Sequence, residues 1–149
     1  MNFRRATASD LPAIVALLAD DELGRKREDA STPPNQRYVD AFAAIDRDPN
    51  QLLAVVERGA DIIGCLQLTF IPGLSRLGMW RGQIESVRVA STERGTGVGR
   101  TMFEWAIEQC RDRRCELVQL TSDKQRPDAL RFYESLGFER SHEGMKLAL

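Results

Sequence analysis

The sequence has few of the residues on which metal, redox and membrane proteins depend. It contains one histidine and three cysteines among 149 residues, and Cys65, Cys110 and Cys115 form no CxxC pair. Zinc sites need about four nitrogen, sulfur or carboxylate ligands at close spacing, so we expect no metal site and three reduced thiols. The longest apolar runs, such as residues 52–56, are far too short to span a bilayer.

An excess of charge of either sign is also missing. The chain carries 21 basic and 22 acidic side chains, a net charge of −1. Nucleic-acid-binding surfaces need a clustered basic excess, so we expect no nucleic-acid partner and no membrane partner. Residues 1–5 lead into polar sequence without the apolar run of a signal peptide. The length and ordinary composition predict one domain, residues 1–149, in the cytoplasm.

Segments with strand character alternate with segments of helical periodicity. Compact apolar runs bounded by turn residues predict strands at 3–6, 52–56, 62–70, 84–89 and 117–120. Apolar residues at helical spacing predict helices at about 11–19, 36–47, 100–111 and 127–136, with a loop at 24–34. The chain from Phe138 onward, with residues 145–149, is expected to close the sheet. The order β-α-α-β-β-β-α-β-α-β predicts an α/β fold, a three-layer α/β/α domain with a mixed, mostly antiparallel sheet.

The most informative segment is the glycine-rich turn at residues 94–100, between a strand and a helix. Glycines let backbone N–H groups approach a ligand, and the helix N-terminus adds a partial positive charge, so the turn suits a phosphate. It lacks the lysine of the ATP/GTP phosphate loop. It also fails the dinucleotide pattern G-x-G-x-x-G, because a match that starts at Gly95 has Arg100 where the last glycine is required. The alternative is a turn that only begins a helix.

Two motifs together carry a family resemblance. The pattern Arg94-x-x-Gly97-x-Gly99 resembles the R/Q-x-x-G-x-G/A signature of the GNAT superfamily of N-acetyltransferases. Downstream, Ala129-Leu130-Arg131-Phe132-Tyr133-Glu134-Ser135-Leu136-Gly137-Phe138 looks like the A-x-x-F-Y-E-x-L-G-F segment of the same family. The strand at residues 84–89 matches the fourth strand of the family. The resemblance is specific over residues 84–138, looser over the rest, and implies a GNAT-like fold.

The resemblance implies acetyl-CoA (coenzyme A) as cosubstrate, with its pyrophosphate held by the glycine turn. A main-chain N–H near Val87 would bind the thioester oxygen, and Val89 would pair with the pantetheine amides. Arg126 stands where many relatives carry asparagine, so its guanidinium either reaches a phosphate or faces solvent. The implied cofactor-binding residues are Val87, Val89, Arg94, Gly95, Thr96, Gly97, Gly99, Arg100 and Arg126.

The resemblance also implies direct attack of an amine on the thioester in a ternary complex, without an acyl-enzyme. Tyr133 is the candidate general acid that protonates the leaving thiolate. The alternative is that its ring only packs against the cofactor. Glu85 is the candidate base, acting through water, because a carboxylate in an otherwise apolar strand loses hydration. The alternative is a solvated glutamate, or one paired with an arginine such as Arg81 or Arg88.

The leading interpretation is an acetyl-CoA-dependent N-acetyltransferase that acts on the primary amine of a small molecule. Two alternatives stay open: a protein lysine or N-terminal acetyltransferase with an open groove, and a non-catalytic acyl-CoA-binding module. The acceptor site is expected between residues 20–34 and residues 71–81, where the acidic residues 20–22 could attract a cationic amine and Leu77, Met79 and Trp80 could form an apolar wall. The basic residues 25–27 could equally attract a carboxylate of the substrate, so the substrate stays open. The sequence leaves the oligomeric state open, and a homodimer through exposed sheet edges is compatible with it.

Overall fold

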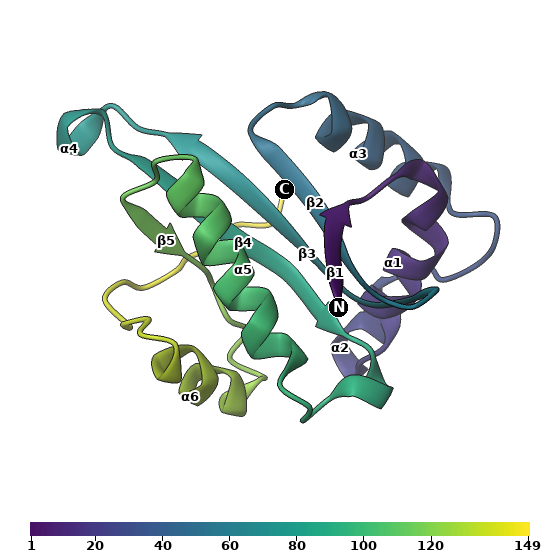
Figure 1. Ribbon diagram of the computed structural model, residues 1–149. Helices are drawn as coiled ribbons and strands as arrows, with labels where there is room; N and C mark the ends of the chain where they lie inside the picture. Colours follow the sequence, from purple (N-terminus) through teal and green to yellow (C-terminus); the bar gives the residue numbers. More distant parts are fainter.

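The chain folds around one five-stranded sheet with the spatial order β1-β2-β3-β4-β5 (Figure 1). The computed structural model describes residues 1–149, with Pro127 described by its backbone alone. Neighbouring strands are antiparallel except β4 and β5, which are parallel. The strands are β1 (Asn2–Arg5), β2 (Gln51–Arg58), β3 (Asp61–Pro72), β4 (Trp80–Val89) and β5 (Leu117–Gln119).

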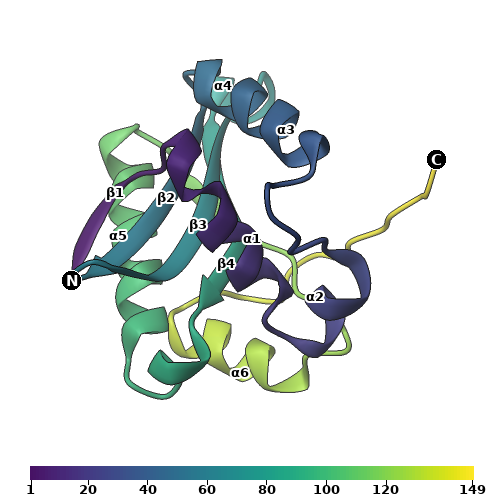
Figure 2. The ribbon, with the colours of Figure 1, turned by 90° about the vertical axis from the view of Figure 1, so that its right-hand side faces the viewer.

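Helices cover both faces of this sheet, as Figure 2 shows, with α5 on one side and α1 and α3 on the other. None of the helices in the described part of the chain is long and apolar enough to cross a membrane. The helices are α1 (Leu11–Ala19), α2 (Glu22–Arg27), α3 (Gln36–Arg47), the short α4 (Ser75–Gly78), α5 (Val98–Asp112) and α6 (Pro127–Ser135), with single 3₁₀ turns at Ala8–Asp10 and Ser91–Glu93.

The central strands are buried on both faces, and β2 shows how the two cores are separated. Ala54 and Val56 pack into the cluster that includes α5, whereas Leu53 and Val55 pack into the cluster that includes α1. Side chains of a strand alternate between faces, so a run of four apolar residues supplies both clusters. The predicted three-layer α/β class is therefore confirmed.

The segment predicted as a loop at residues 24–34 begins with a helix, α2. Its N-cap is Asp21, whose carboxylate accepts a hydrogen bond from the Gly24 N–H at 2.5 Å. Glu22 lies in its first turn and basic residues in its last, which suits the helix dipole. Such a helix has little apolar periodicity, so capping and charge rather than hydrophobic pattern mark its position.

The final strand expected at residues 145–149 does not form. The described residues after α6 contain no strand, and the sheet ends at β5. Met145, Leu147 and Leu149 are 95%, 86% and 118% exposed. The alternating apolar pattern that predicted a strand is present, but the segment lies beyond the sheet of its own chain and finds no strand there to pair with.

We expect Asp10→Asn to lower the free energy of unfolding by about 2 kcal/mol at pH 7. Asp10 is buried and receives two hydrogen bonds from the Arg4 guanidinium, at 2.7 and 3.0 Å. The Arg4 hydrogen bonds lower the pKa of Asp10 from 3.8 to about 2, against the opposing effect of burial. Stability from this carboxylate is therefore present above pH 3.8 and is lost as the pH falls through about 2.

Urea denaturation at pH 7 and near pH 2 measures this difference. The exposed Asp61 gives a matched control, because Asp61→Asn removes the same charge from the surface. A destabilisation by Asp10→Asn that is equally large at both pH values would contradict an electrostatic origin.

Candidate functional site

The sheet opens between its two parallel strands. Pairing of β4 with β5 runs only from Arg81 opposite Leu117 to Gln83 opposite Gln119. The strand β4 continues to Val89, so residues 84–89 have no strand beside them on the β5 side. Main-chain groups along this half of β4 are therefore available to an extended ligand that carries amides.

A bulge in β4 sets the orientation of these groups. Glu85 lies opposite Gln67 and Arg88 opposite Cys65, so two residues of β4 face one residue of β3. Ser86, within the bulge, has a φ of +55°. The Ala90 N–H donates to the Ile63 carbonyl at 2.8 Å. Because antiparallel bonding alternates, the N–H and C=O of Val89 point into the opening. Val87 lies in the bulge, and its carbonyl accepts a hydrogen bond from Arg88 Nη1 at 2.9 Å.

The glycine turn lies at the end of this strand. Gly95 and Gly97 have φ angles of +79° and +91°, where a β-carbon would be strained. Gly97 is the N-cap of α5, so the first N–H groups of this 15-residue helix have no acceptor within the helix. A Cβ added to Gly99 would contact Val89 Cγ2 at 3.8 Å and Phe132 Cζ at 3.9 Å. The turn thus joins β4, α5 and α6, and the free N–H groups of the helix start are of the kind that suits an anion.

The polar side chains of the turn are anchored around it. Arg94 donates to the Asp20 carbonyl at 2.6 Å, and Thr96 Oγ1 donates to the Glu93 carbonyl at 2.6 Å. Arg100 donates to Ser135 Oγ at 2.9 Å. These bonds fix the turn to the loop after α1 and to α6, so its backbone is preorganised for a ligand.

Tyr133 lies on α6 and packs against the same core as Val87 and Val89. Its ring meets Phe103 edge to face, with centroids 5.4 Å apart. Burial raises the pKa of Tyr133, although Arg126 and Arg88 act in the opposite direction. The phenol is therefore protonated at neutral pH, as a proton donor must be. Its role as general acid remains a prediction.

Glu85 is exposed, so the loss of hydration expected for it does not occur. Its carboxylate accepts one long hydrogen bond, 3.5 Å, from Gln83 Nε2. The arginine pairing considered for it is not formed with Arg88, whose Nε lies 3.7 Å from Asp21 Oδ2 instead. A role as base, acting through water, stays a prediction for Glu85.

A charged cluster that the sequence did not predict joins three elements. Arg126 Nη2 lies 2.7 Å from Asp21 Oδ2, so Arg126 at the start of α6 and Arg88 on β4 both approach the N-cap of α2. Burial lowers the pKa of Arg88, and the nearby Arg126 adds to this. Burial opposes ionisation of Asp21, but the Gly24 N–H, Arg126, Arg88 and Arg27 outweigh it and lower its pKa.

The cluster has more positive charge than its one carboxylate neutralises. The Arg88 side chain is only 15% exposed, and its Nε makes no hydrogen bond among the described groups. A buried, unpaired donor is costly, so a ligand acceptor here would be favourable. One feature of the sequence could have indicated this cluster. Arg88 stands between Val87 and Val89 in an apolar strand, and charged residues are rarely buried without a partner.

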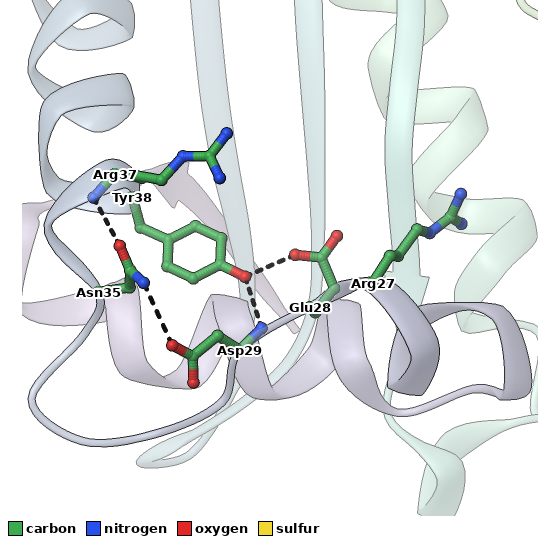
Figure 3. A pocket seen from close by; sticks show the side chains of 6 residues that line it. All are labelled: Arg27, Glu28, Asp29, Asn35, Arg37 and Tyr38. Carbon is green, nitrogen blue, oxygen red and sulfur yellow. Dashed lines mark hydrogen bonds between the residues drawn. The ribbon is translucent and has the colours of Figure 1, made fainter.

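A cavity of about 330 Å³ lies between α2 and α3 (Figure 3). Tyr38 is one of the lining residues, and its hydroxyl donates to Glu28 at 2.7 Å and accepts from the Asp29 N–H at 2.9 Å. The guanidinium groups of Arg27 and Arg37 also line it and are outside this hydrogen-bond network. Arg27 also acts on Asp21 and Arg88, so it lies between this cavity, which Glu28 and Asp29 line as well, and the positive cluster.

The two segments expected to form the acceptor site do not line one cavity. The cavity falls at residues 27–38, but residues 71–81 do not line it. They form the β3–β4 hairpin with α4, which lies away from α2 in Figure 1, and Leu77 is fully exposed there. Two of the three acidic residues 20–22 are bonded within the protein, because Asp20 accepts from Arg94 and Asp21 from Arg126.

Within the described residues, no group of histidine, cysteine, aspartate and glutamate side chains could hold a metal ion. The three cysteines are free thiols.

Comparison with known proteins agrees with these features. The model of the Acetyltransferase (GNAT) family matches residues 13–138. The aminoalkylphosphonate N-acetyltransferase of Salmonella typhimurium is 32% identical over 139 residues, which are 93% of this chain and 85% of that protein.

Two solved structures are similar over nearly the whole chain. A crystal structure of a transcriptional regulator from Bacillus halodurans C-125 is 52% identical, covers 99% of both chains and has a TM-score of 0.96. A putative acetyltransferase from Agrobacterium tumefaciens str. C58 is 26% identical over 100% of both chains, with a TM-score of 0.87. The opened sheet and the glycine turn therefore occur in a fold shared with acetyltransferases.

Proposed function

Because the chain belongs to the acetyltransferase (GNAT) family, we propose that it transfers the acetyl group of acetyl-CoA to the primary amine of a small, anionic molecule. The observation that carries this proposal is the opening beside residues 84–89 of β4, which leads directly to the glycine turn of α5. The opening suits an extended chain with amides, and the turn suits a pyrophosphate. Reduced cysteines are consistent with the cytoplasm as the proposed location.

The proposed reaction is one displacement. The amine nitrogen attacks the thioester carbonyl carbon, a C–N bond forms, and the C–S bond breaks. The N–H of Val87 donates to the carbonyl oxygen as negative charge develops on it. Tyr133 gives its phenolic proton to the leaving sulfur, and Glu85 accepts the ammonium proton through water. The protonated state of Tyr133 supports its role, and the roles of Val87 and Glu85 rest on the family resemblance.

Charge at the acceptor side supports an amine that carries a phosphonate, phosphate or similar group. Arg27 and Arg37 line the cavity together with Glu28 and Asp29, so its own side-chain charge is balanced. The two carboxylates are hydrogen-bonded to Tyr38 and Asn35, whereas Arg88 and Arg126 lie beyond the cavity and add positive charge. Guanidinium groups bind such anions through paired, charge-assisted hydrogen bonds. The name of the Salmonella relative describes a substrate of this class, which lends the proposal further support.

The function is tested by measuring thiol release from acetyl-CoA with aminoalkylphosphonates and with uncharged alkylamines of the same length. We expect kcat/KM to be at least tenfold higher for the phosphonates, a difference of about 1.4 kcal/mol. Equal rates with both sets would remove the anionic-substrate proposal but keep the acetyltransferase. Calorimetry that detects no acetyl-CoA binding to the folded protein would remove both.

Arg37→Gln is expected to raise KM for an aminoalkylphosphonate by roughly 10- to 100-fold, the effect of one lost charge-assisted hydrogen bond. The guanidinium lies at the cavity, away from the thioester, so kcat is expected to change little. Arg47→Gln on the same helix α3 is the matched control, since Arg47 is exposed and does not line the cavity. Steady-state kinetics in which both variants behave alike would contradict a role for Arg37 in binding the anion.

A further inference from the structure

Arg88 is a largely buried arginine on the half of β4 that has no strand beside it on the β5 side. Its partner across the ladder is Cys65, which packs into the core cluster on the α1 side of the sheet. Residues paired across two antiparallel strands point to the same face. The neighbours Val87 and Val89 pack into the opposite cluster, with α5. The guanidinium of Arg88 therefore lies on the α1 side, beside the N-cap of α2.

The carboxylate nearest to Arg88 is committed to other donors. Asp21 accepts from the Gly24 N–H at 2.5 Å and from Arg126 at 2.7 Å. The Nε of Arg88 lies 3.7 Å from Asp21 Oδ2, too far for a hydrogen bond. In the part of the chain that the structure describes, this Nε is one of two buried side-chain nitrogen or oxygen atoms without a hydrogen-bond partner. A buried, charged donor without a partner is costly, so an oxyanion that reaches Nε would be bound strongly.

The same guanidinium also holds the bulge of β4. Arg88 Nη1 donates to the Val87 carbonyl at 2.9 Å. Val87 follows Ser86, which has a φ of +55°, and the Val87 N–H is the proposed donor to the thioester oxygen. Since a guanidinium is planar and rigid, an anion held at Nε would also fix the direction of Nη1. One side chain therefore connects an anion contact with the strand segment proposed to bind the thioester.

Glu85, the proposed base, lies on the same face of β4 as Arg88. Glu85 is opposite Gln67, and Arg88 is opposite Cys65, two residues away on β3. Two residues of a strand span about 7 Å, and residues at this spacing share a face. An acceptor whose amine lies near Glu85 would therefore place an anion near Arg88 if a short linker joins the two groups.

We propose that Arg88 is the specificity-determining residue of the acetyl transfer: its Nε binds the phosphonate, phosphate or carboxylate of the acceptor while its Nη1 holds the bulge of β4. This inference rests on the proposed function and assigns the anion contact to one side chain. The anion is remote from the reacting nitrogen, and binding energy from a remote group can be used to position the reacting atoms in the transition state. An acceptor without the anion is therefore expected to lose kcat as well as affinity.

Steady-state kinetics of Arg88→Gln and Arg88→Lys, with an aminoalkylphosphonate and an alkylamine of the same length, test this assignment. In Arg88→Gln we expect the ratio of the two kcat/KM values, phosphonate over alkylamine, to fall at least about tenfold, with part of the loss in kcat. Arg88→Lys keeps the charge without the planar donor pair and is expected to restore part of the ratio. Arg81→Gln is the matched control, because Arg81 lies on the half of β4 that pairs with β5. Equal losses with both acceptors would show that Arg88 only supports the strand and would overturn the proposal.

Calorimetric titration with methylphosphonate, an anion without an amine, measures the contact without acetyl transfer. We expect at least about tenfold weaker binding in Arg88→Gln and wild-type affinity in Arg81→Gln, with urea denaturation as the check that both variants are folded. No binding to the wild type, or equal affinity in Arg88→Gln, would overturn the contact even in a protein that acetylates both amines. Binding that depends on Arg88 in a protein that transfers no acetyl group would support the contact and remove the proposed function instead.

Discussion

A glutamate at Gly97 is expected to reduce the affinity for acetyl-CoA by at least about 100-fold, a loss of roughly 2.8 kcal/mol. Two physical effects add. The φ of +91° at this residue is strained for any residue with a β-carbon, which costs about 1–2 kcal/mol of local stability. The carboxylate would also stand at the N-terminus of α5, where the proposed pyrophosphate meets the first free N–H groups. Calorimetric titration with acetyl-CoA measures the loss.

Two further variants separate these effects. Gly59→Glu is the matched control, because Gly59 also has a positive φ, +63°, and open space around it, but lies in the β2–β3 turn. It carries the same strain and charge, and we expect unchanged acetyl-CoA affinity. Gly97→Ala carries the strain without the charge and is expected to bind with an intermediate affinity. Wild-type affinity in Gly97→Glu would show that the turn only begins a helix.

How well the sequence predicts the fold depends on whether an element is marked by apolar periodicity. The helix α3 was predicted with its observed bounds, Gln36–Arg47, because Tyr38, Phe42 and Ile45 form a stripe that ends before Pro49. The polar helix α2 was missed, because its N-cap bond and its charges leave no apolar period. Periodicity at residues 145–149 predicted a closing strand that does not form, because alternation of apolar residues does not say whether a neighbouring strand is within reach.

The functional site, too, could be predicted only where its residues are contiguous in the sequence. The glycine turn and the Tyr133 segment are contiguous motifs, so their residue types and order could be recognised along the chain. The cluster of Asp21, Arg88 and Arg126 could not, because the Asp21–Arg126 bond joins residues 105 positions apart. Charge pairs of this kind depend on tertiary packing, which brings α2, β4 and α6 together. The sequence offered the basic residues 25–27 as a possible anion contact, but the contribution of Arg88 and Arg126 became visible only in the structure.

Tyr133→Phe is expected to lower kcat by about 10²- to 10⁴-fold, the usual contribution of a positioned general acid. The variant keeps the ring that packs on Phe103, so acetyl-CoA affinity and stability are expected to stay close to wild type. Because burial raises the pKa of Tyr133 above its ordinary value of 10.0, the wild-type phenol is protonated throughout the neutral range. Activity that depends on this proton is retained below that raised pKa and lost as the pH rises through it. The pH–activity profile of the Phe variant should lack this alkaline limb, the fall in activity at high pH.

Tyr133→Leu is the companion variant, since it removes the ring together with the hydroxyl. If Tyr133 only packs, the Phe variant keeps the wild-type kcat, and the Leu variant alone loses activity because the contacts with Phe103 and Phe138 are lost. If Tyr133 is the general acid, both variants lose kcat to a similar extent, and only the Leu variant also loses stability in urea denaturation. Retention of the alkaline limb in the Phe variant would assign that limb to another group. The two rate constants, compared with acetyl-CoA affinities measured by calorimetry, therefore distinguish proton donation from packing.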